Sequence, residues 1–245
     1  MFIYGYSLVI WNLLIGCDDL DFISSIFNPI VQLLEFILGI FHDFLSTVGL
    51  ESYGVAIIVL TIIIKMAFYP LTVKQVKSMK AMQELQPKMK KLQDKFKNDP
   101  KRLQQEMGML YKNAGVNPLA GCLPLLAQMP ILMAMFYALQ SIDYGGDPTF
   151  LWIMNLSNPD PYYILPVLSA ISTYVVQKQT SSASSSPQMQ MQMKIMSVVM
   201  PLFIGWISCN FAAGLVIYWI VNNIMQILQQ WWMYRHEDTS AKKGS

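Results

Sequence analysis

Long apolar segments recur along the chain between polar stretches, and one of them contains a full positive charge. Residues 55–71 are almost entirely apolar apart from Lys65. As a helix this segment would be about 25 Å long, close to the roughly 30 Å thickness of a bilayer's hydrocarbon core. We therefore predict that residues 51–71 form a membrane-spanning helix with a charge inside it.

Four more apolar segments predict four more spans. They are residues 118–140, 162–177, 195–211 and 214–234. Pro124 and Pro130 predict bends in the first of these segments. The last two are separated by Ala212 and Ala213, which leave room only for a tight turn. The predicted fold class is an all-α integral membrane protein with five transmembrane helices.

Residues 22–50 predict a helix of another kind. Its polar or small positions recur every three or four residues, which places them on one narrow stripe: Asn28, Gln32, Glu35, Gly39, His42 and Ser46. Asn28 and Pro29 are typical of a helix N-cap and first position. A helix with one polar stripe among apolar residues is expected to lie in the membrane interface rather than to span the bilayer.

Residues 72–117 form the most highly charged block, with eleven Lys and Arg against four Asp and Glu. An apolar seam with helical spacing runs through Met82, Leu85, Met89, Leu92 and Phe96. The sequence Asn98–Asp99–Pro100 predicts a break and a new helix start. A second seam through Leu103, Met107 and Leu110 ends near Gly115. These patterns predict an antiparallel helical hairpin outside the membrane.

The composition of the remaining segments predicts less regular structure. Residues 1–17 resemble a signal segment without the usual basic start, and Leu14–Cys17 fits a lipobox, so Cys17 is a predicted lipidation site. Residues 141–161 are predicted to be an outer loop, and the serine-rich residues 178–194 a flexible cytoplasmic loop. Residues 235–245 are predicted to be a short disordered tail.

Composition and charge agree with this organisation. The chain is 54% hydrophobic and 13% charged, whereas soluble domains are about 25% charged. With the N-terminus outside, the predicted inner segments hold every Lys and Arg except Lys65, and the outer segments hold nine acids and no Lys or Arg. The positive-inside rule therefore predicts a cytoplasmic hairpin and a cytoplasmic C-terminus.

The chemistry that the sequence lacks narrows the function. It contains no nucleotide-binding, hydrolase or zinc-binding motif, and the spacing of its three cysteines fits neither a disulfide framework nor a metal site. We expect no enzyme activity, no cofactor and no metal. Apart from Glu51 at the outer end of the first, the predicted spans contain no acid, but they do contain Lys65 and hydrogen-bonding side chains: Gln128, Gln140, Gln177, Asn210, Trp219, Asn222, Asn223 and Gln226.

Lys65 has two interpretations. Its long side chain could carry the ammonium to the nearer interface. Alternatively, Lys65 could be the charge of a polar cavity within the membrane, which would attract an acidic or polar peptide segment. The residues alone leave both interpretations open.

Several stretches resemble the YidC-type membrane protein insertases in their short, five-span form. They are TIIIKMAFYPL, the hairpin with the following VNPLAGCLPLLAQMPI, and FAAGLVIYWIVNN. The resemblance covers nearly everything from Phe27 to Tyr234. It implies a protein of the bacterial plasma membrane that inserts and folds other membrane proteins, alone or beside the Sec translocon.

The resemblance also implies a hydrophilic groove, open to the cytoplasm and to lipid, in which a positive residue attracts the polar tail of a substrate. Lys65 holds that position, where the family usually has arginine. Gln177 and Trp219 match groove positions, and with Gln128 and Asn222 they complete the predicted groove. The chain departs from the family after Phe211, where a proline is common.

Expected partners are nascent membrane proteins, membrane lipids and, through the hairpin, the Sec translocon, the ribosome and the targeting machinery. No recognition of a specific nucleic-acid sequence is expected. The alternative function is a small-solute transporter or channel, which would predict two-sided access and inverted repeats, and the sequence has no internal repeat. A purely structural scaffold would leave Lys65 unexplained.

Overall fold

The computed structural model describes residues 20–47, 49, 52–116, 123–141, 148–180 and 187–243. Within these ranges the secondary structure is helical apart from one β-bridge between Phe150 and Ile153. The helices are α2 (Leu20–Thr47), α3 (Tyr53–Ala67), α4 (Tyr69–Lys95), α5 (Pro100–Ala114), α6 (Leu123–Ser141), α7 (Ile164–Thr180), α8 (Pro187–Ser208) and α9 (Ala213–Lys243). The predicted all-α class is confirmed for this part of the chain.

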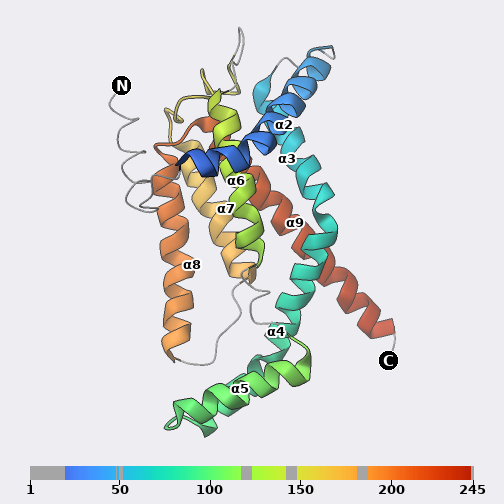
Figure 1. Ribbon diagram of the computed structural model, residues 1–245, viewed down its shortest axis with the longest axis vertical. Coiled ribbons are helices and arrows are strands. Elements are labelled where there is room, and N and C mark those ends of the chain that lie inside the picture. Colours follow the sequence, from blue (N-terminus) through green and yellow to red (C-terminus); the bar gives the residue numbers. More distant parts are fainter. Residues whose placement is uncertain are drawn as a thin grey trace.

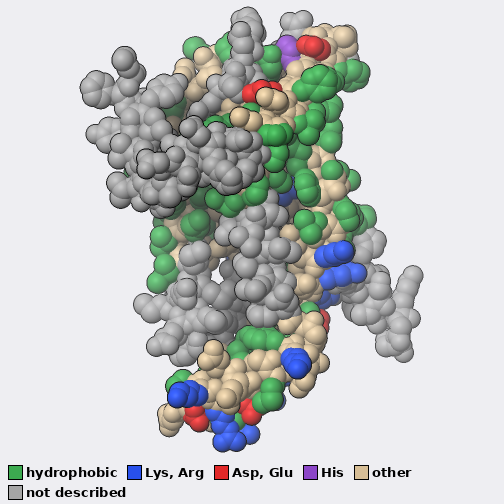
Figure 2. All heavy atoms as spheres, in the orientation of Figure 1, with side chains coloured by type: hydrophobic (Ala, Val, Ile, Leu, Met, Phe, Trp, Pro, Cys, Tyr) green, Lys and Arg blue, Asp and Glu red, His purple; other side chains and the backbone are tan. Residues whose placement is uncertain are grey.

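The helices form a bundle with one helix lying across it and a hairpin extending from it (Figure 1). α7 packs against both α8 and α9, and α9 also packs against α3. α2 crosses α3 and α6 at the end opposite the α4–α5 hairpin. Apolar side chains cover much of the visible bundle, whereas Lys and Arg gather on α4 and α5 (Figure 2).

The sequence predicts one spanning helix over residues 51–71. In the structure, residues 55–71 do not form one straight helix. α3 ends at Ala67, and α4 leaves it at an angle of 64°. Pro70 lies in the first turn of α4. Because proline has no N–H, it cannot continue the hydrogen-bond ladder of α3 to the carbonyl of Met66, and the helix breaks there.

α2 also differs from its prediction at the N-terminal end. It begins at Leu20, two residues before the predicted start, so Asn28 does not cap it and Pro29 lies inside the helix. A single proline removes one hydrogen bond, and the apolar stripe continues on both sides of it. In the described residues, Asn28–Thr47 is the straight segment long and apolar enough to cross a bilayer, and α3 with α4 reaches that length only as a bent pair.

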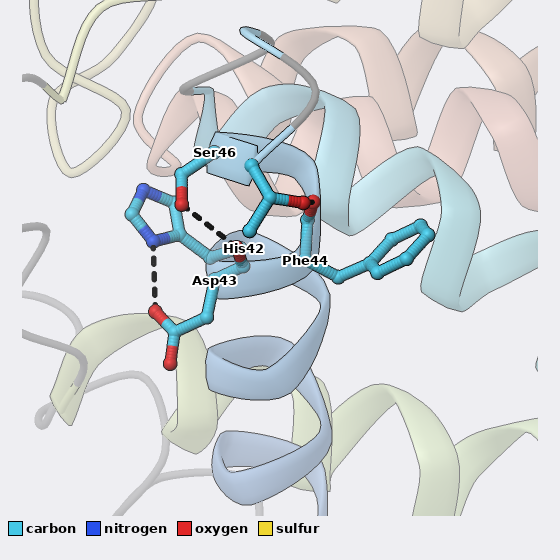
Figure 3. A network of polar contacts seen from close by, with 5 residues as sticks. His42, Asp43, Phe44 and Ser46 are labelled. Atoms are coloured by element: carbon cyan, nitrogen blue, oxygen red, sulfur yellow. Dashed lines mark hydrogen bonds and ion pairs between the residues drawn. The ribbon is translucent and has the colours of Figure 1, made fainter.

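The two apolar faces of α2 have different surroundings. Val31, Leu34 and Leu38 are buried against the bundle. A second row stays exposed, made up of Ile30, Leu33, Phe36, Ile40 and Phe44. The C-terminal end is closed by polar contacts, since the Ser46 hydroxyl donates to the Asp43 carbonyl at 2.7 Å (Figure 3). The ring of His42 stacks on Tyr53 at 4.0 Å, which joins α2 to α3.

Two further predictions about helix ends are wrong. The loop predicted at residues 178–194 is shorter, because α7 continues to Thr180 and α8 begins at Pro187, a residue suited to a first helical position. The tail predicted to be disordered continues α9 to Lys243, since Gly and Pro are absent until Gly244. The bend predicted at Pro124 stays a prediction, because residues 117–122, directly before α6, lie outside the described residues.

The loop before α7, which the sequence predicts to lie outside the membrane, is held in place at several points. The buried carboxylate of Asp160 accepts hydrogen bonds from the Trp152 indole at 3.1 Å and from the amides of Tyr162 at 3.0 Å and Leu165 at 2.7 Å. The loop carbonyls of Asn158 and Leu156 accept from the first amides of α9, Ala213 at 2.8 Å and Gly214 at 3.0 Å. This loop therefore connects the starts of α7 and α9.

The outer loop also reaches α3 through a close contact with a glycine. A Cβ at Gly54 would overlap the ring of Phe150. Phe150 lies in the β-bridge with Ile153, which is itself buried. Only glycine allows the ring to lie this close to the first turn of α3.

In the hairpin, Asp99 caps α5 by accepting from the amide of Arg102 at 3.1 Å, and α5 ends at Gly115 with a φ of 64°. The seam brings α4 and α5 together, and the Tyr111 hydroxyl donates to the sulfur of Met89 at 3.7 Å. Burial beside α4 raises the pKa of Tyr111. The hairpin is thus a folded element with its own small apolar contact.

Candidate functional site

One face of α9 carries the polar side chains that connect the bundle helices. Its members recur at helical spacing along the interior side: Tyr218, Trp219, Asn222, Asn223, Gln229 and Gln230. Tyr218 and Gln230 are each 1% exposed, and Asn222 is 7% exposed. Buried polar groups need hydrogen-bond partners, so the partners of this face show how the bundle is joined.

The outer part of the polar face of α9 contacts α6. The Gln128 amide donates to the Tyr218 hydroxyl at 2.7 Å. Sequence reasoning singled out Gln128 but not Tyr218, because a tyrosine in an apolar run gives no polar signal of its own. Its spacing of four residues from Asn222 was the available signal.

The polar face also joins α9 to α7. The indole N–H of Trp219 donates to the Thr173 hydroxyl at 3.0 Å, and the Asn223 amide lies within hydrogen-bond distance of the hydroxyls of Ser172 and Thr173. One turn earlier, the Ser169 hydroxyl donates to that of Ser208 on α8 at 3.0 Å. Trp219 is thus anchored by its N–H rather than free to turn.

Lys65 lies in the last turn of α3, half-buried, and pairs with no acidic side chain in the described part of the chain. Its backbone carbonyl accepts a hydrogen bond from the Gln229 amide of α9 at 3.3 Å. Because Gln229 lies eleven residues beyond Tyr218, this contact is about 16 Å along α9 from the Gln128 contact.

The predicted groove residues therefore do not form one compact cluster. Gln128, Trp219 and Asn222 lie near one another on or beside the outer part of the polar face, and Lys65 lies towards its inner end. Gln177 is half-buried near the end of α7. Sequence reasoning missed Gln229 and Gln230, whose buried side-chain oxygens have no hydrogen-bond partner within the described residues.

An apolar crevice lies beside Trp219, between α6, α8 and α9. Its walls include Met133, Phe136, Ile204, Ile207 and Leu215. Counted out to its open mouth, the crevice holds about 520 Å³ of empty space. A spanning helix about 10 Å wide and 30 Å long occupies well over ~2,000 Å³, so the crevice can admit side chains from one face of a helix but not a whole helix.

The described residues contain no candidate metal site, because no three His, Cys, Asp or Glu side chains among them lie close enough together to hold an ion. His42 instead lies 3.6 Å from the exposed carboxylate of Asp43 (Figure 3). The predicted lipidation site, Cys17, lies outside the described residues.

Most of the chain is similar to bacterial membrane proteins. Residues 44–241 match the family described as 60Kd inner membrane protein. Membrane protein insertase YidC of Clostridium perfringens is 38% identical over 218 residues, which cover 86% of this chain and 92% of the relative. Membrane protein insertase YidC 2 of Bacillus anthracis is 42% identical over 220 residues, covering 88% of this chain and 82% of the relative.

Longer relatives match over only part of their length. Membrane protein insertase YidC of Geobacter sulfurreducens is 39% identical over 226 residues, which are 92% of this chain but 40% of the relative. The chain therefore spans about two fifths of the length of such relatives and most of the length of those from Clostridium and Bacillus.

Proposed function

Because this chain belongs to the 60Kd inner membrane protein family, we propose that it is a membrane protein insertase whose polar α9 face and apolar crevice receive two different parts of a substrate. The polar tail of the substrate lies along the polar face, near Lys65. The apolar segment of the substrate packs against the crevice beside Trp219. An insertase of this kind moves a polypeptide without making or breaking covalent bonds.

The observation that carries this proposal is the position of Trp219 between two environments. Its N–H donates to Thr173 in the polar network, and its ring lines the apolar crevice. A segment entering the membrane needs both environments at once, because its tail must keep its hydrogen bonds while its apolar part leaves water.

The inner part of the α9 face supplies the remaining polar groups. Gln229 and Gln230 are buried and carry side-chain oxygens without a partner among the described residues. An unpaired buried acceptor is unfavourable by about 1–3 kcal/mol. Lys65, half-buried at this end of the face, would attract any acidic residue in the tail.

The proposal includes a topology with five spans. The broken α3–α4 pair, α6, α7, α8 and α9 are the spanning elements, and α2 lies in the outer interface. The N-terminus is outside and the C-terminus is cytoplasmic, in keeping with the distribution of Lys and Arg. α7 has 17 residues, about 25 Å of helix, which is short for a straight span and favours a locally thin bilayer.

Reconstitution tests the function. The full chain is purified into liposomes with no other protein, and insertion of a small single-span substrate is measured by protease protection. We expect protected substrate in proportion to the amount of insertase, and no flux of ions or small solutes. Solute flux without insertion would instead identify the alternative, a transporter or channel.

Deleting residues 87–112 from the hairpin is expected to reduce insertion in cells by at least about three-fold while the bundle still assembles. The hairpin carries most of the basic residues and its own apolar contact, and we propose that it meets ribosomal RNA, the targeting machinery, the Sec translocon or anionic lipid headgroups. Insertion in cells is measured at matched expression, with assembly checked by thermal unfolding. Normal insertion by the shortened protein would contradict a recruiting role.

A further inference from the structure

The inner end of α9 contacts the chain on both sides of the α3–α4 bend. On the α3 side, the Gln229 amide donates to the Lys65 carbonyl at 3.3 Å. On the α4 side, Met233 is buried in a cluster with Val76 and Met79. Gln229 and Met233 are four residues apart, so they lie on the same face of α9. Figure 1 shows α9 crossing the chain where α3 gives way to α4.

Local hydrogen bonds hold the bend only in part, since the Phe68 amide donates to the Ile64 carbonyl and the Phe68 carbonyl accepts from the amides of Leu71 and Thr72. Lys65 carries one of the last four carbonyls of α3, which have no partner within the helix. Pro70, in the first turn of α4, provides no N–H for the Met66 carbonyl, and none of these local donors reaches the Lys65 carbonyl. The Gln229 side chain, which is 7% exposed, provides that donor from another helix. The 64° angle therefore depends on α9 as well as on the two helices that it joins.

We propose that Gln229 is a positioning residue that fixes the angle at which the hairpin leaves α3 and, with it, the depth of the Lys65 side chain. We name Gln229, Met233, Val76, Met79 and the Lys65 carbonyl the hinge cluster. A partner that pulls on the hairpin would act on this cluster and so move the charge that meets the substrate. The link to insertion rests on the proposed function, whereas the hinge itself does not.

The hinge is tested by distance measurements on the full chain in lipid nanodiscs. Spin labels at Gln105 on α5 and Val198 on α8, both exposed, report the hairpin relative to the bundle by pulsed electron resonance. Labels at Val167 and Val198 report the bundle alone. Cys17, Cys122 and Cys209 are replaced by serine in every sample.

Gln229→Met keeps the size of the side chain but removes the donor. We expect this change to raise about five-fold the ratio of molecules with a displaced hairpin to molecules with the hairpin in place. This factor corresponds to one hydrogen bond of about 1 kcal/mol. The bundle distance should stay unchanged. Met233→Ala is expected to widen the same distribution from the α4 side. Leu228→Met, on the exposed side of α9, is the matched control and should change neither distance.

An unchanged hairpin distance in Gln229→Met, or an equal change in both distances, would overturn the hinge. In the liposome assay, Gln229→Met should insert several-fold more slowly, and a short crosslink between cysteines at Val76 and Met233 should restore the rate. If Gln229→Met widens the distribution of hairpin distances but inserts the substrate at the normal rate, the link to Lys65 is overturned. Failure of the wild-type chain to insert any substrate would count against the proposed function and not against the hinge.

Discussion

Lys65→Glu is expected to lower insertion of a substrate with three acidic residues in its tail by about a hundred-fold. At an effective dielectric constant of about 20, two charges at contact attract by about 4 kcal/mol. After desolvation we expect a net contribution of about 1.4 kcal/mol, which is a factor of ten in occupancy. Lys65→Gln loses that factor, and Lys65→Glu adds a repulsion of similar size. Lys65→Arg should keep the activity.

The measurement uses a series of substrates whose tails carry zero to three acids, with each variant at equal expression. The dependence on the number of acids is the decisive result, because a general defect would affect the whole series equally. Lys77→Gln is the matched control, since it removes a lysine from an exposed position on α4. If Lys65→Gln inserts every substrate of the series as well as the wild type does, the ammonium of Lys65 only reaches the inner interface and does not attract the substrate tail.

Asp160→Ala is expected to destabilise the protein by about 3–4 kcal/mol. The carboxylate is 3% exposed and accepts from Trp152, Tyr162 and Leu165. Removing it leaves three buried donors without a partner, and hydrogen bonds to a charged group contribute about 1.5–3 kcal/mol each before the loop relaxes. Reversible unfolding in mixed micelles measures the loss.

The stability of Asp160→Asn should lie between that of the wild type and that of Asp160→Ala. Its side-chain oxygen can still accept from Trp152 and Tyr162, but its NH₂ group would face the N–H of Leu165, which is also a donor. Asp43→Asn, at an exposed site on α2, is the control and should be neutral. Hydrogen exchange adds a local readout, since the amides of Ala213 and Gly214 should lose protection together with the loop. Stability of Asp160→Ala equal to that of wild type would show that the loop does not hold the starts of α7 and α9.

The sequence predicts the positions of the helices well wherever an apolar run is bounded by turn residues. Asn98–Pro100 shows why, because Asp99 and Pro100 are both residue types favoured at a helix start, and Asp99 does accept from Arg102. Pro70 was ambiguous, since a proline at the end of an apolar run can belong to the helix before it or begin the next one. The structure shows that it begins a new helix with a different direction.

The site is less predictable from sequence, because its contacts join residues far apart in the chain. Trp219 and Thr173 are 46 residues apart, and Gln229 and Lys65 are 164 apart. No local pattern indicates such pairs. Asp160 is one of the nine acids in the predicted outer segments, and nothing in its sequence neighbourhood marks it as the one that a folded loop buries.

The contacts at the two ends of α9 also decide which wall of the crevice can yield. The first amides of α9 are held by the carbonyls of Asn158 and Leu156, and its inner part is held through Gln229 and Met233. α6 and α8 form the opposite walls, and each is packed mainly against another helix, α2 and α7 respectively. If the chain is the insertase proposed above, we therefore expect a guest helix too large for the crevice to displace α6 or α8 rather than α9.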